Sequence, residues 1–373
     1  MNTAHKICFS DCRDLSEIEK DTVNLTVTSP PYPMIEMWDE LFSSQNSEIK
    51  QSLINGNGNE AFEKMHVELD KVWNEVNRVT KEGGFVAINI GDATRKIGDY
   101  FQLYSNHTRI TSKFISLGFD VLPVILWQKT TNSPNKFMGS GMLPAGAYVT
   151  LEHEYILIFR KGHRRTFIAE SDKNNRNSSA FFWEERNTWF SDSWDLKGVF
   201  QNLFNGKTRE RSAAYPFELP YRLINMYSVK GDVVLDPFLG TGTTVLAAAI
   251  CERNSIGYEI DNNFKDIIFN KINNLKYQSY ELAKLRINAH LSFLKGFLER
   301  KGEIKHSNVF YKFPVVTSQE KHLSISYIND IKQIDSVFNL QHKAYEQNSE
   351  DVIFMNNVEG EQQISLFEKC VNT

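Results

Sequence analysis

The segment between residues 232 and 261 constrains the fold of this 373-residue chain more than any other. Residues 232–236 (DVVLD) predict a short buried strand, and a loop with two glycines follows at 237–244. The apolar residues 245–251 then predict a helix, and residues 255–261 predict a second strand. A strand, a loop, a helix and a strand in this order indicate a βαβ unit of a mainly parallel sheet.

The rest of the chain repeats this alternation of strand and helix signals. The predicted helices cover 60–80 and 264–298, and further predicted strands cover 25–28, 85–90, 121–127 and 154–159. The stretch 43–59 is rich in Ser, Asn and Gly, so we expect a mobile loop there. Gly83 and Gly84 are expected to end the first long helix. The pattern as a whole indicates an α/β fold.

Composition limits the classes of function that are open to the chain. Hydrophobic residues make up 41% and charged residues 24%, as in ordinary folded proteins, and the length suffices for a core without disulfide or metal support. Lys and Arg total 42 against 46 Asp and Glu. This balance excludes a histone-like basic protein, but it leaves a nucleic-acid binder whose positive charge is local.

The sequence also predicts a soluble protein of the reducing cytoplasm. The first residues do not resemble a signal peptide, and no run approaches the roughly 20 apolar residues of a membrane span, so no membrane partner is expected. The four cysteines are Cys8, Cys12, Cys251 and Cys370. Their spacing is not typical of a zinc site or a disulfide framework, and we therefore expect free thiols and no metal site.

The glycine loop is the first candidate site. Gly240 and Gly242 would let the backbone approach a ligand closely, and the helix that follows would present unpaired N–H groups. Asp236, at the end of the strand, could hold the loop or accept a hydrogen bond from a cationic amine. Glu259 ends the next strand, where an acid can accept both hydroxyls of a ribose.

Known glycine loops narrow the choice of ligand. A dinucleotide site needs the third glycine of GxGxxG, and a Walker loop needs a Lys after its last glycine; this loop has neither. A nucleoside ligand without phosphates fits better. S-adenosylmethionine, with its adenine, ribose, sulfonium and amino acid, is such a ligand. The alternative is a glycine-rich turn with a purely structural role.

The TSPPY segment at 28–32 is the second candidate site, because it ends the strand predicted at 25–28. The two prolines fix φ and leave rigid carbonyls without competing N–H donors. Ser29 supplies a hydroxyl oxygen, Pro30 a carbonyl and Tyr32 a flat ring. These groups could receive an exocyclic amine, with two acceptors for its two hydrogens and a ring beneath the base. The alternative is a proline-rich turn with a packed tyrosine.

Together, TSPPY and the later DPFLGTGTT at 236–244 resemble the DNA amino-methyltransferases of bacterial restriction–modification systems. The order, with the proline motif first and the glycine loop far downstream, matches the permuted group usually called β. The resemblance covers about residues 5 to 275. It implies a Rossmann-like methyltransferase sheet, S-adenosyl-L-methionine as the methyl donor, and a cytosine or adenine flipped out of double-stranded DNA as the acceptor.

The resemblance also implies roles for particular residues. The implied catalytic residues are Ser29, Pro30, Pro31 and Tyr32. The implied cofactor site consists of Asp11, Thr28, Asp236, Pro237, Phe238, Gly240, Gly242, Thr243 and Glu259. Asp11 matches the family's adenine-contacting position, although Ser10 replaces the usual glycine. The ring of Phe238 could add a cation–π contact to the sulfonium of about 0.5–2 kcal/mol.

A serine at the first position of the proline motif resembles the N4-cytosine branch of the family, whereas aspartate is usual there in the N6-adenine branch. We therefore expect a DNA (cytosine-N4) methyltransferase that protects host sites from a cognate restriction endonuclease. The alternatives are an N6-adenine enzyme of the same fold and a catalytically silent DNA-binding subunit. RNA or protein amines would also fit the proline turn chemically.

The resemblance divides the chain into four parts. They are a catalytic half at 1–159, an inserted target-recognition region at 160–212, a cofactor-binding half at 213–275, and a C-terminal helical extension at 276–373. The residues expected to contact DNA phosphates are Arg160, Lys161, Arg164, Arg165, Lys207 and Arg209. For each of them a solvated loop charge is the alternative. The aromatic run at 181–194 is expected to form a small core rather than a surface that stacks on bases.

Overall fold

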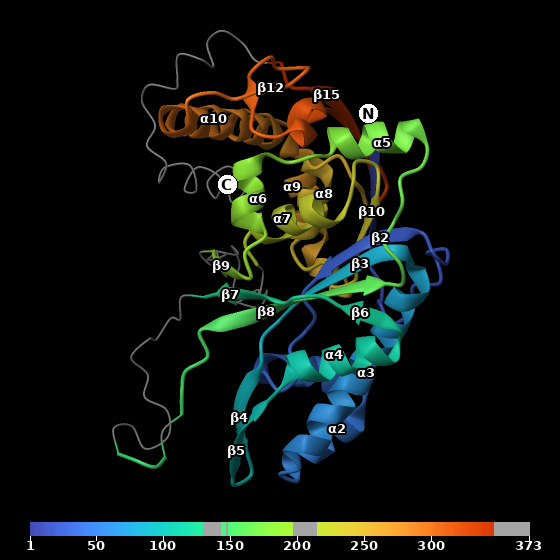
Figure 1. The fold of residues 1–373 in the computed structure, drawn as a ribbon. Helices are drawn as coiled ribbons and strands as arrows, with labels where there is room; N and C mark the ends of the chain where they lie inside the picture. Colours follow the sequence, from blue (N-terminus) through green and yellow to red (C-terminus); the bar gives the residue numbers. More distant parts are fainter. Residues whose placement is uncertain (130–142, 147, 197–214, 347–373) are drawn as a thin grey trace.

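The computed structural model describes residues 1–129, 143–146, 148–196 and 215–346. Most strands join one large sheet (Figure 1). They are β1 (Asn2–Cys8), β2 (Val23–Thr28), β3 (Thr80–Ile90), β6 (Phe119–Val121), β7 (Ile125–Gln128), β8 (His153–Lys161), β9 (Ser193–Asp195), β10 (Val233–Asp236), β11 (Asn254–Tyr258), β14 (Ser326–Ile334) and β15 (Val337–Ala344). Their order is β14-β15-β1-β11-β10-β2-β3-β8-β7-β9, with β6 also paired to β8.

Helices and two short strand pairs complete the fold. The helices are α1 (Asp39–Gln45), α2 (Ser47–Ile54), α3 (Gly58–Val79), α4 (Asn106–Ser116), α5 (Glu170–Ser178), α6 (Trp183–Trp189), α7 (Glu218–Tyr227), α8 (Thr243–Ile250), α9 (Lys265–Asn273) and α10 (Leu275–Lys301). The strand pairs are β4 (Ala93–Ile97) with β5 (Tyr100–Tyr104), and β12 (His306–Ser307) with β13 (Pro314–Val315). Among the described residues, none of the helices is both long and apolar enough to cross a membrane.

The middle of the sheet is parallel, as the βαβ pattern predicted. Strands β1, β11, β10, β2 and β3 pair in turn and run in the same direction. Their carboxyl ends therefore meet at one edge, where open α/β sheets bind ligands. Strand β8 is antiparallel to β3, and its residue Tyr155 pairs with Ile90 at the end of β3. The beginning of β8 thus reaches the same edge.

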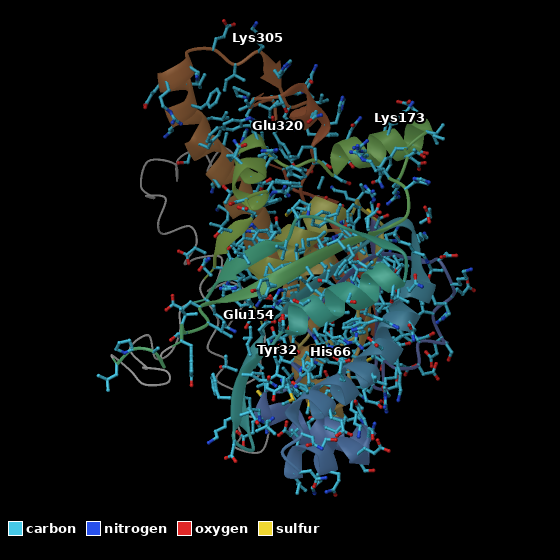
Figure 2. All side chains as sticks on the ribbon, turned by 60° about the horizontal axis from the view of Figure 1, so that its bottom comes forward. Tyr32, His66, Glu154, Lys173, Lys305 and Glu320 are labelled. Carbon is cyan, nitrogen blue, oxygen red and sulfur yellow. The ribbon has the colours of Figure 1, made fainter. Side chains whose placement is uncertain are left out.

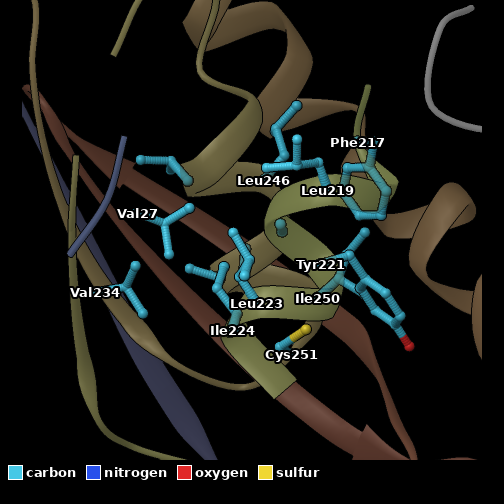
Figure 3. Packing of buried hydrophobic residues seen from close by; sticks show 14 of the residues in the cluster. Val27, Phe217, Leu219, Tyr221, Leu223, Ile224, Val234, Leu246, Ile250 and Cys251 are labelled. Carbon is cyan, nitrogen blue, oxygen red and sulfur yellow. The ribbon is translucent and has the colours of Figure 1, made fainter. Parts of the chain in front are cut away.

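Both faces of the central strands are buried. Successive strand residues point to opposite faces, so Val234 packs in the apolar cluster that includes α7 and α8, while Leu235 packs in the cluster that includes α3 and α4. Figure 3 shows the first cluster, in which Val27 and Val234 face Leu223, Ile224 and other side chains of α7 and α8. Figure 1 shows the two helical layers on opposite sides of the sheet. The predicted α/β class is confirmed.

The structure corrects several predicted boundaries. The stretch 43–59 was wrongly predicted as a loop: it contains the end of α1 and all of α2, and the side chain of Asn46 caps α2 by accepting from Glu48 N at 3.0 Å. Ser and Asn favour helix caps as much as loops, so composition alone misled. Gly83 does not end the helix but lies inside β3 with φ +75°. Pro123 separates β6 from β7, where one strand was predicted.

Parts of the expected insertion and extension belong to the main fold. Strand β9 pairs with β7, so residues of the insertion form an edge of the sheet. The aromatic run forms core in part, as predicted: Trp189 and Trp194 are buried, and Phe182 stacks on His290 of α10 with ring centroids 3.9 Å apart. Its other members include Trp183 and Phe190, which are exposed. The predicted helix at 264–298 is two helices, α9 and α10, divided at Asn274. Beyond them, the β14–β15 hairpin pairs with β1, which the sequence did not predict.

Candidate functional site

A cavity opens at the carboxyl ends of β2, β10 and β11. Its wall includes residues 29–31 from the turn after β2 and residues 237–241 from the loop after β10. The two segments are far apart in the sequence, but Val234 pairs with Leu25 in the sheet, so they leave neighbouring strands. The structure therefore brings the proline turn and the glycine loop to one cavity.

A buried hydrogen bond ties the two segments together. Thr28 Oγ1 donates to Asp236 Oδ1 at 2.6 Å, and the backbone N–H of Phe238 donates to the same oxygen at 3.1 Å. The Tyr215 hydroxyl donates to Asp236 Oδ2 at 3.4 Å. Burial raises the pKa of Asp236, and these donors oppose that shift. Thr28 and Asp236 are not among the residues of the cavity wall. Asp236 was expected either to hold the loop or to accept from a cationic amine of the ligand, and this geometry matches the first role.

Glu259 connects the glycine loop to the end of β11. Its Oε2 accepts from the backbone N–H of Gly240 at 2.8 Å, and its Oε1 accepts from that of Asp261 at 2.8 Å. Burial raises the pKa of Glu259, and the two backbone hydrogen bonds oppose that shift. The residue lines the cavity. Because a carboxylate offers about four lone-pair sites, the side chain can hold the loop and still accept from two ligand hydroxyls.

The two glycines of the loop adopt left-handed conformations, with φ +53° at Gly240 and +89° at Gly242. A Cβ atom added to Gly240 would meet nothing within 4 Å. Gly240 therefore borders open space, so a ligand can approach the backbone there. Gly242 is the N-cap of α8, and Thr243, at the start of that helix, lines the cavity. The loop provides an uncovered backbone and a helix start next to the cavity.

Asp11 lies on the wall of the cavity, where the resemblance places a contact to adenine. Arg13 binds its carboxylate through Nε at 2.9 Å and Nη2 at 2.6 Å, and it reaches Glu68 through Nη1 at 2.7 Å. Partial burial opposes ionisation of Asp11, but the hydrogen bonds from Arg13 outweigh this and lower the pKa of its carboxyl. The guanidinium of Arg13 and the carboxylate of Glu68 were not predicted as parts of the site.

Other wall residues come from helices that the motifs do not mark. Trp38 precedes α1, Phe42 and Gln45 lie on α1, and Leu69 and Val72 lie on α3. The apolar spacing of α3 predicted its helix and its buried face, but not that part of this face borders a ligand cavity. Helix α1 begins just before the stretch that was predicted as a loop. No sequence pattern therefore indicated that Trp38, Phe42 and Gln45 border a ligand site.

A cluster of polar side chains surrounds the hydroxyl of Tyr32. This hydroxyl donates to Glu154 Oε2 at 2.8 Å, and it accepts from Ser29 Oγ at 3.2 Å and from Asn89 Nδ2 at 2.8 Å. Lys129 Nζ donates to Glu154 Oε1 at 2.5 Å. Figure 2 shows Tyr32 and Glu154 close together. Tyr32 is 9% exposed and does not belong to the cavity wall, whereas Ser29 does.

Among the described residues, the basic side chains expected to bind DNA, at 160–165, do not line the cavity. Arg160 pairs with Asp120, and Arg165 pairs with the buried carboxylate of Asp232. Lys161 donates to two backbone carbonyls near the start of β3. These three side chains lie at the end of the sheet opposite to Glu154. Arg164 is exposed next to them. Lys207 and Arg209 lie outside the described residues.

This chain is similar to known proteins in sequence and in fold. A family model described as DNA methylase matches residues 23–270. The type II methyltransferase M.MthZI of Methanothermobacter thermautotrophicus is 55% identical over 336 residues, covering 90% of this chain and 93% of that protein. M.MjaI of Methanocaldococcus jannaschii is 52% identical, covering 73% and 92%. The crystal structure of TTHA0409 of Thermus thermophilus with S-adenosyl-L-methionine has 29% identity and a TM-score of 0.56, covering 73% and 95%.

The chain therefore belongs to the DNA methylases, a family of N6/N4 DNA methyltransferases. The predicted Rossmann-like methyltransferase sheet is confirmed, and so is S-adenosylmethionine as the methyl donor of the family. DNA is the substrate of this class of enzyme.

Proposed function

We propose that this protein transfers a methyl group from S-adenosyl-L-methionine to the exocyclic N4 amine of a cytosine that is flipped out of double-stranded DNA. The observation that carries the proposal is the shared cavity, because the proline turn at 29–31 and the glycine loop at 237–241 lie on the same wall. Ser29 at the first motif position favours cytosine over adenine. M.MthZI and M.MjaI are named type II methyltransferases, which supports a role beside a cognate restriction endonuclease.

The residues of the cavity fit S-adenosylmethionine, which when bound supplies the methyl group on a positively charged sulfur. Glu259 would accept the ribose hydroxyls with the lone pairs that its two backbone donors leave free. Asp11 would accept from the adenine amine. The open backbone at Gly240 and the start of α8 at Thr243 would face the ligand. The ring of Phe238 would stabilise the sulfonium by about 0.5–2 kcal/mol.

The proline turn activates the amine in this proposal. An exocyclic amine is a poor nucleophile because its lone pair conjugates with the base. Ser29 Oγ and the Pro30 carbonyl would accept its two N–H bonds, which favours a pyramidal nitrogen and frees the lone pair. The ring of Tyr32 is 9% exposed and outside the cavity wall, so it would have to become uncovered when DNA binds in order to lie beneath the base. By holding the amine, these residues would supply most of the rate of a direct transfer through positioning, and water would take the proton of the product.

DNA would reach the cavity with its target base out of the stack, at a cost of a few kcal/mol. Lys207 and Arg209 would contact DNA phosphates. The roles of Arg160, Lys161 and Arg165 would be structural, because their partners lie at the far end of the sheet. Arg164 is adjacent to Arg165 and therefore lies at that same end, away from the cavity.

One experiment tests the proposal. The protein is incubated with labelled S-adenosylmethionine and genomic DNA, the DNA is digested to nucleosides, and the labelled nucleoside is identified. N4-methylcytosine is expected, and the methylated DNA should resist the cognate endonuclease. Label in N6-methyladenine would refute the choice of base. Label in the protein together with unlabelled DNA would refute the substrate class.

A further inference from the structure

We propose that Glu154, acting through Tyr32, fixes the hydroxyl proton of Ser29 so that Ser29 Oγ meets the substrate amine only as a hydrogen-bond acceptor. This inference rests on the proposed function, because it explains how the acceptor in that mechanism is oriented. It makes Glu154 a positioning residue: its carboxylate acts on the amine through two other side chains.

Glu154, a buried residue near the beginning of β8, determines which group donates in each of these hydrogen bonds. Its carboxylate accepts from three donors, which are the Tyr32 hydroxyl at 2.8 Å, Asn89 Nδ2 at 2.7 Å and Lys129 Nζ at 2.5 Å. Lys129 also balances its charge. An ionised carboxylate has lone pairs and no proton to give. Every neighbour of this group must therefore donate to it.

Because Tyr32 donates to Glu154, its hydroxyl can only accept from Ser29. A phenol carries one proton, and here the proton is directed to Glu154. Burial, followed by the negative charge of Glu154, raises the pKa of Tyr32 well above its ordinary value, so the phenol keeps that proton. The lone pairs of the hydroxyl receive Asn89 Nδ2 at 2.8 Å and Ser29 Oγ at 3.2 Å. Tyr32 has no second proton that it could offer to Ser29.

Ser29 stands at the end of this chain of donors and lines the cavity. Its single proton is used toward Tyr32. The lone pairs that remain on Oγ can then receive an N–H bond of the target amine. A serine hydroxyl without such a partner would rotate, and its proton could then point at the amine nitrogen and compete for the lone pair that must attack. The chain of three side chains removes that orientation before substrate binds.

Three variants separate an acceptor role from other roles. Glu154→Leu removes the acceptor and lets the Tyr32 hydroxyl turn toward Ser29. Tyr32→Phe removes the relay hydroxyl but keeps the ring. Glu154→Gln keeps a carbonyl oxygen that can still face Tyr32, with its amide nitrogen toward the partly exposed Lys129. Glu152→Leu is the matched control, because it makes the same change at an exposed residue two positions before Glu154.

The rate of methyl transfer in a single turnover, with saturating S-adenosylmethionine and DNA, is the readout. We expect Glu154→Leu and Tyr32→Phe to slow transfer at least tenfold and Glu154→Gln to stay within about threefold of wild type. The Glu152→Leu rate should be unchanged. In a Ser29→Ala background, Glu154→Leu and Tyr32→Phe should add nothing further, because they act only through Ser29.

Other results would overturn the inference. If Glu154→Gln is as slow as Glu154→Leu, the negative charge matters rather than the acceptor. If the losses persist unchanged in the Ser29→Ala background, Glu154 and Tyr32 only support the fold. Should Glu154→Leu not fold, Tyr32→Phe, which deletes one hydroxyl, gives the same test. Full rates in both variants, beside normal transfer by the wild-type protein, would refute this inference and leave the proposed function intact.

Discussion

Replacement of Glu259 by glutamine tests the proposed cofactor site most directly. Both carboxylate oxygens accept backbone hydrogen bonds at 2.8 Å, one from Gly240 and one from Asp261. An amide can accept at only one end, so Glu259→Gln sets an N–H group against one backbone donor and removes one acceptor for the ribose. A hydrogen bond to a charged group is worth about 1.5–3 kcal/mol. We therefore expect the Kd for S-adenosylmethionine to rise roughly 10- to 150-fold.

Calorimetric titration of the purified protein with S-adenosylmethionine measures this change. Glu19→Gln is the control, since it makes the same substitution at an exposed turn before β2, at the other end of the sheet, and should leave the affinity unchanged. Thermal unfolding without ligand reports whether the loop itself has been destabilised. An unchanged Kd for Glu259→Gln would refute the assignment of Glu259 to the ribose, even if the variant unfolds at a lower temperature.

Three further predictions concern Ser29, Arg165 and His5. Ser29→Ala should bind S-adenosylmethionine normally but slow methyl transfer about a hundredfold, or about 2.7 kcal/mol, in single-turnover assays; full activity would disprove its acceptor role. Arg165→Ala should lower the free energy of unfolding in urea by about 1–2 kcal/mol, discounted for the partial exposure of Arg165, and leave DNA affinity unchanged; weaker DNA binding would restore its predicted phosphate contact. Burial lowers the pKa of His5 from 6.5 to about 3, so the unfolded chain binds a proton there that the folded protein does not. Calorimetry should show stability falling as pH drops below 6.5, and His5 alone should contribute up to about 1.4 kcal/mol per unit to that fall. The fall should be shallower in His5→Asn, and an equal fall in the variant would refute this role of His5.

The cofactor loop could be predicted from sequence because its residues serve structure and chemistry together. The strand at 233–236 is apolar on both faces since helices cover both sides, and this makes it recognisable without knowledge of its neighbours. Gly240 and Glu259 then stand at fixed positions relative to that strand and the next. The meeting of the two motifs also followed from the fold class, since parallel strands end at one edge of a sheet.

The rest of the site could not be predicted because it depends on contacts between distant segments. The hydrogen bond from Tyr32 to Glu154 joins residues 122 positions apart, and no local pattern reports which hydroxyl a buried carboxylate faces. The DNA contacts of the basic residues remain predictions for a related reason. A run of arginines and lysines reports charge but not its partner, and here Asp120 and Asp232 are already present as partners. The stretch 43–59 shows that composition cannot separate a capped helix from a loop.

The position of β1 in the sheet has a consequence for how the protein is made. This strand, Asn2–Cys8, precedes the other described strands in the chain, but its two neighbours are β11 and β15. At roughly 5–20 residues per second, these partners emerge on the order of ten seconds to a minute later. During synthesis β1 must therefore wait with both edges unpaired, and the five parallel strands can all pair only after β11, Asn254–Tyr258, has been translated.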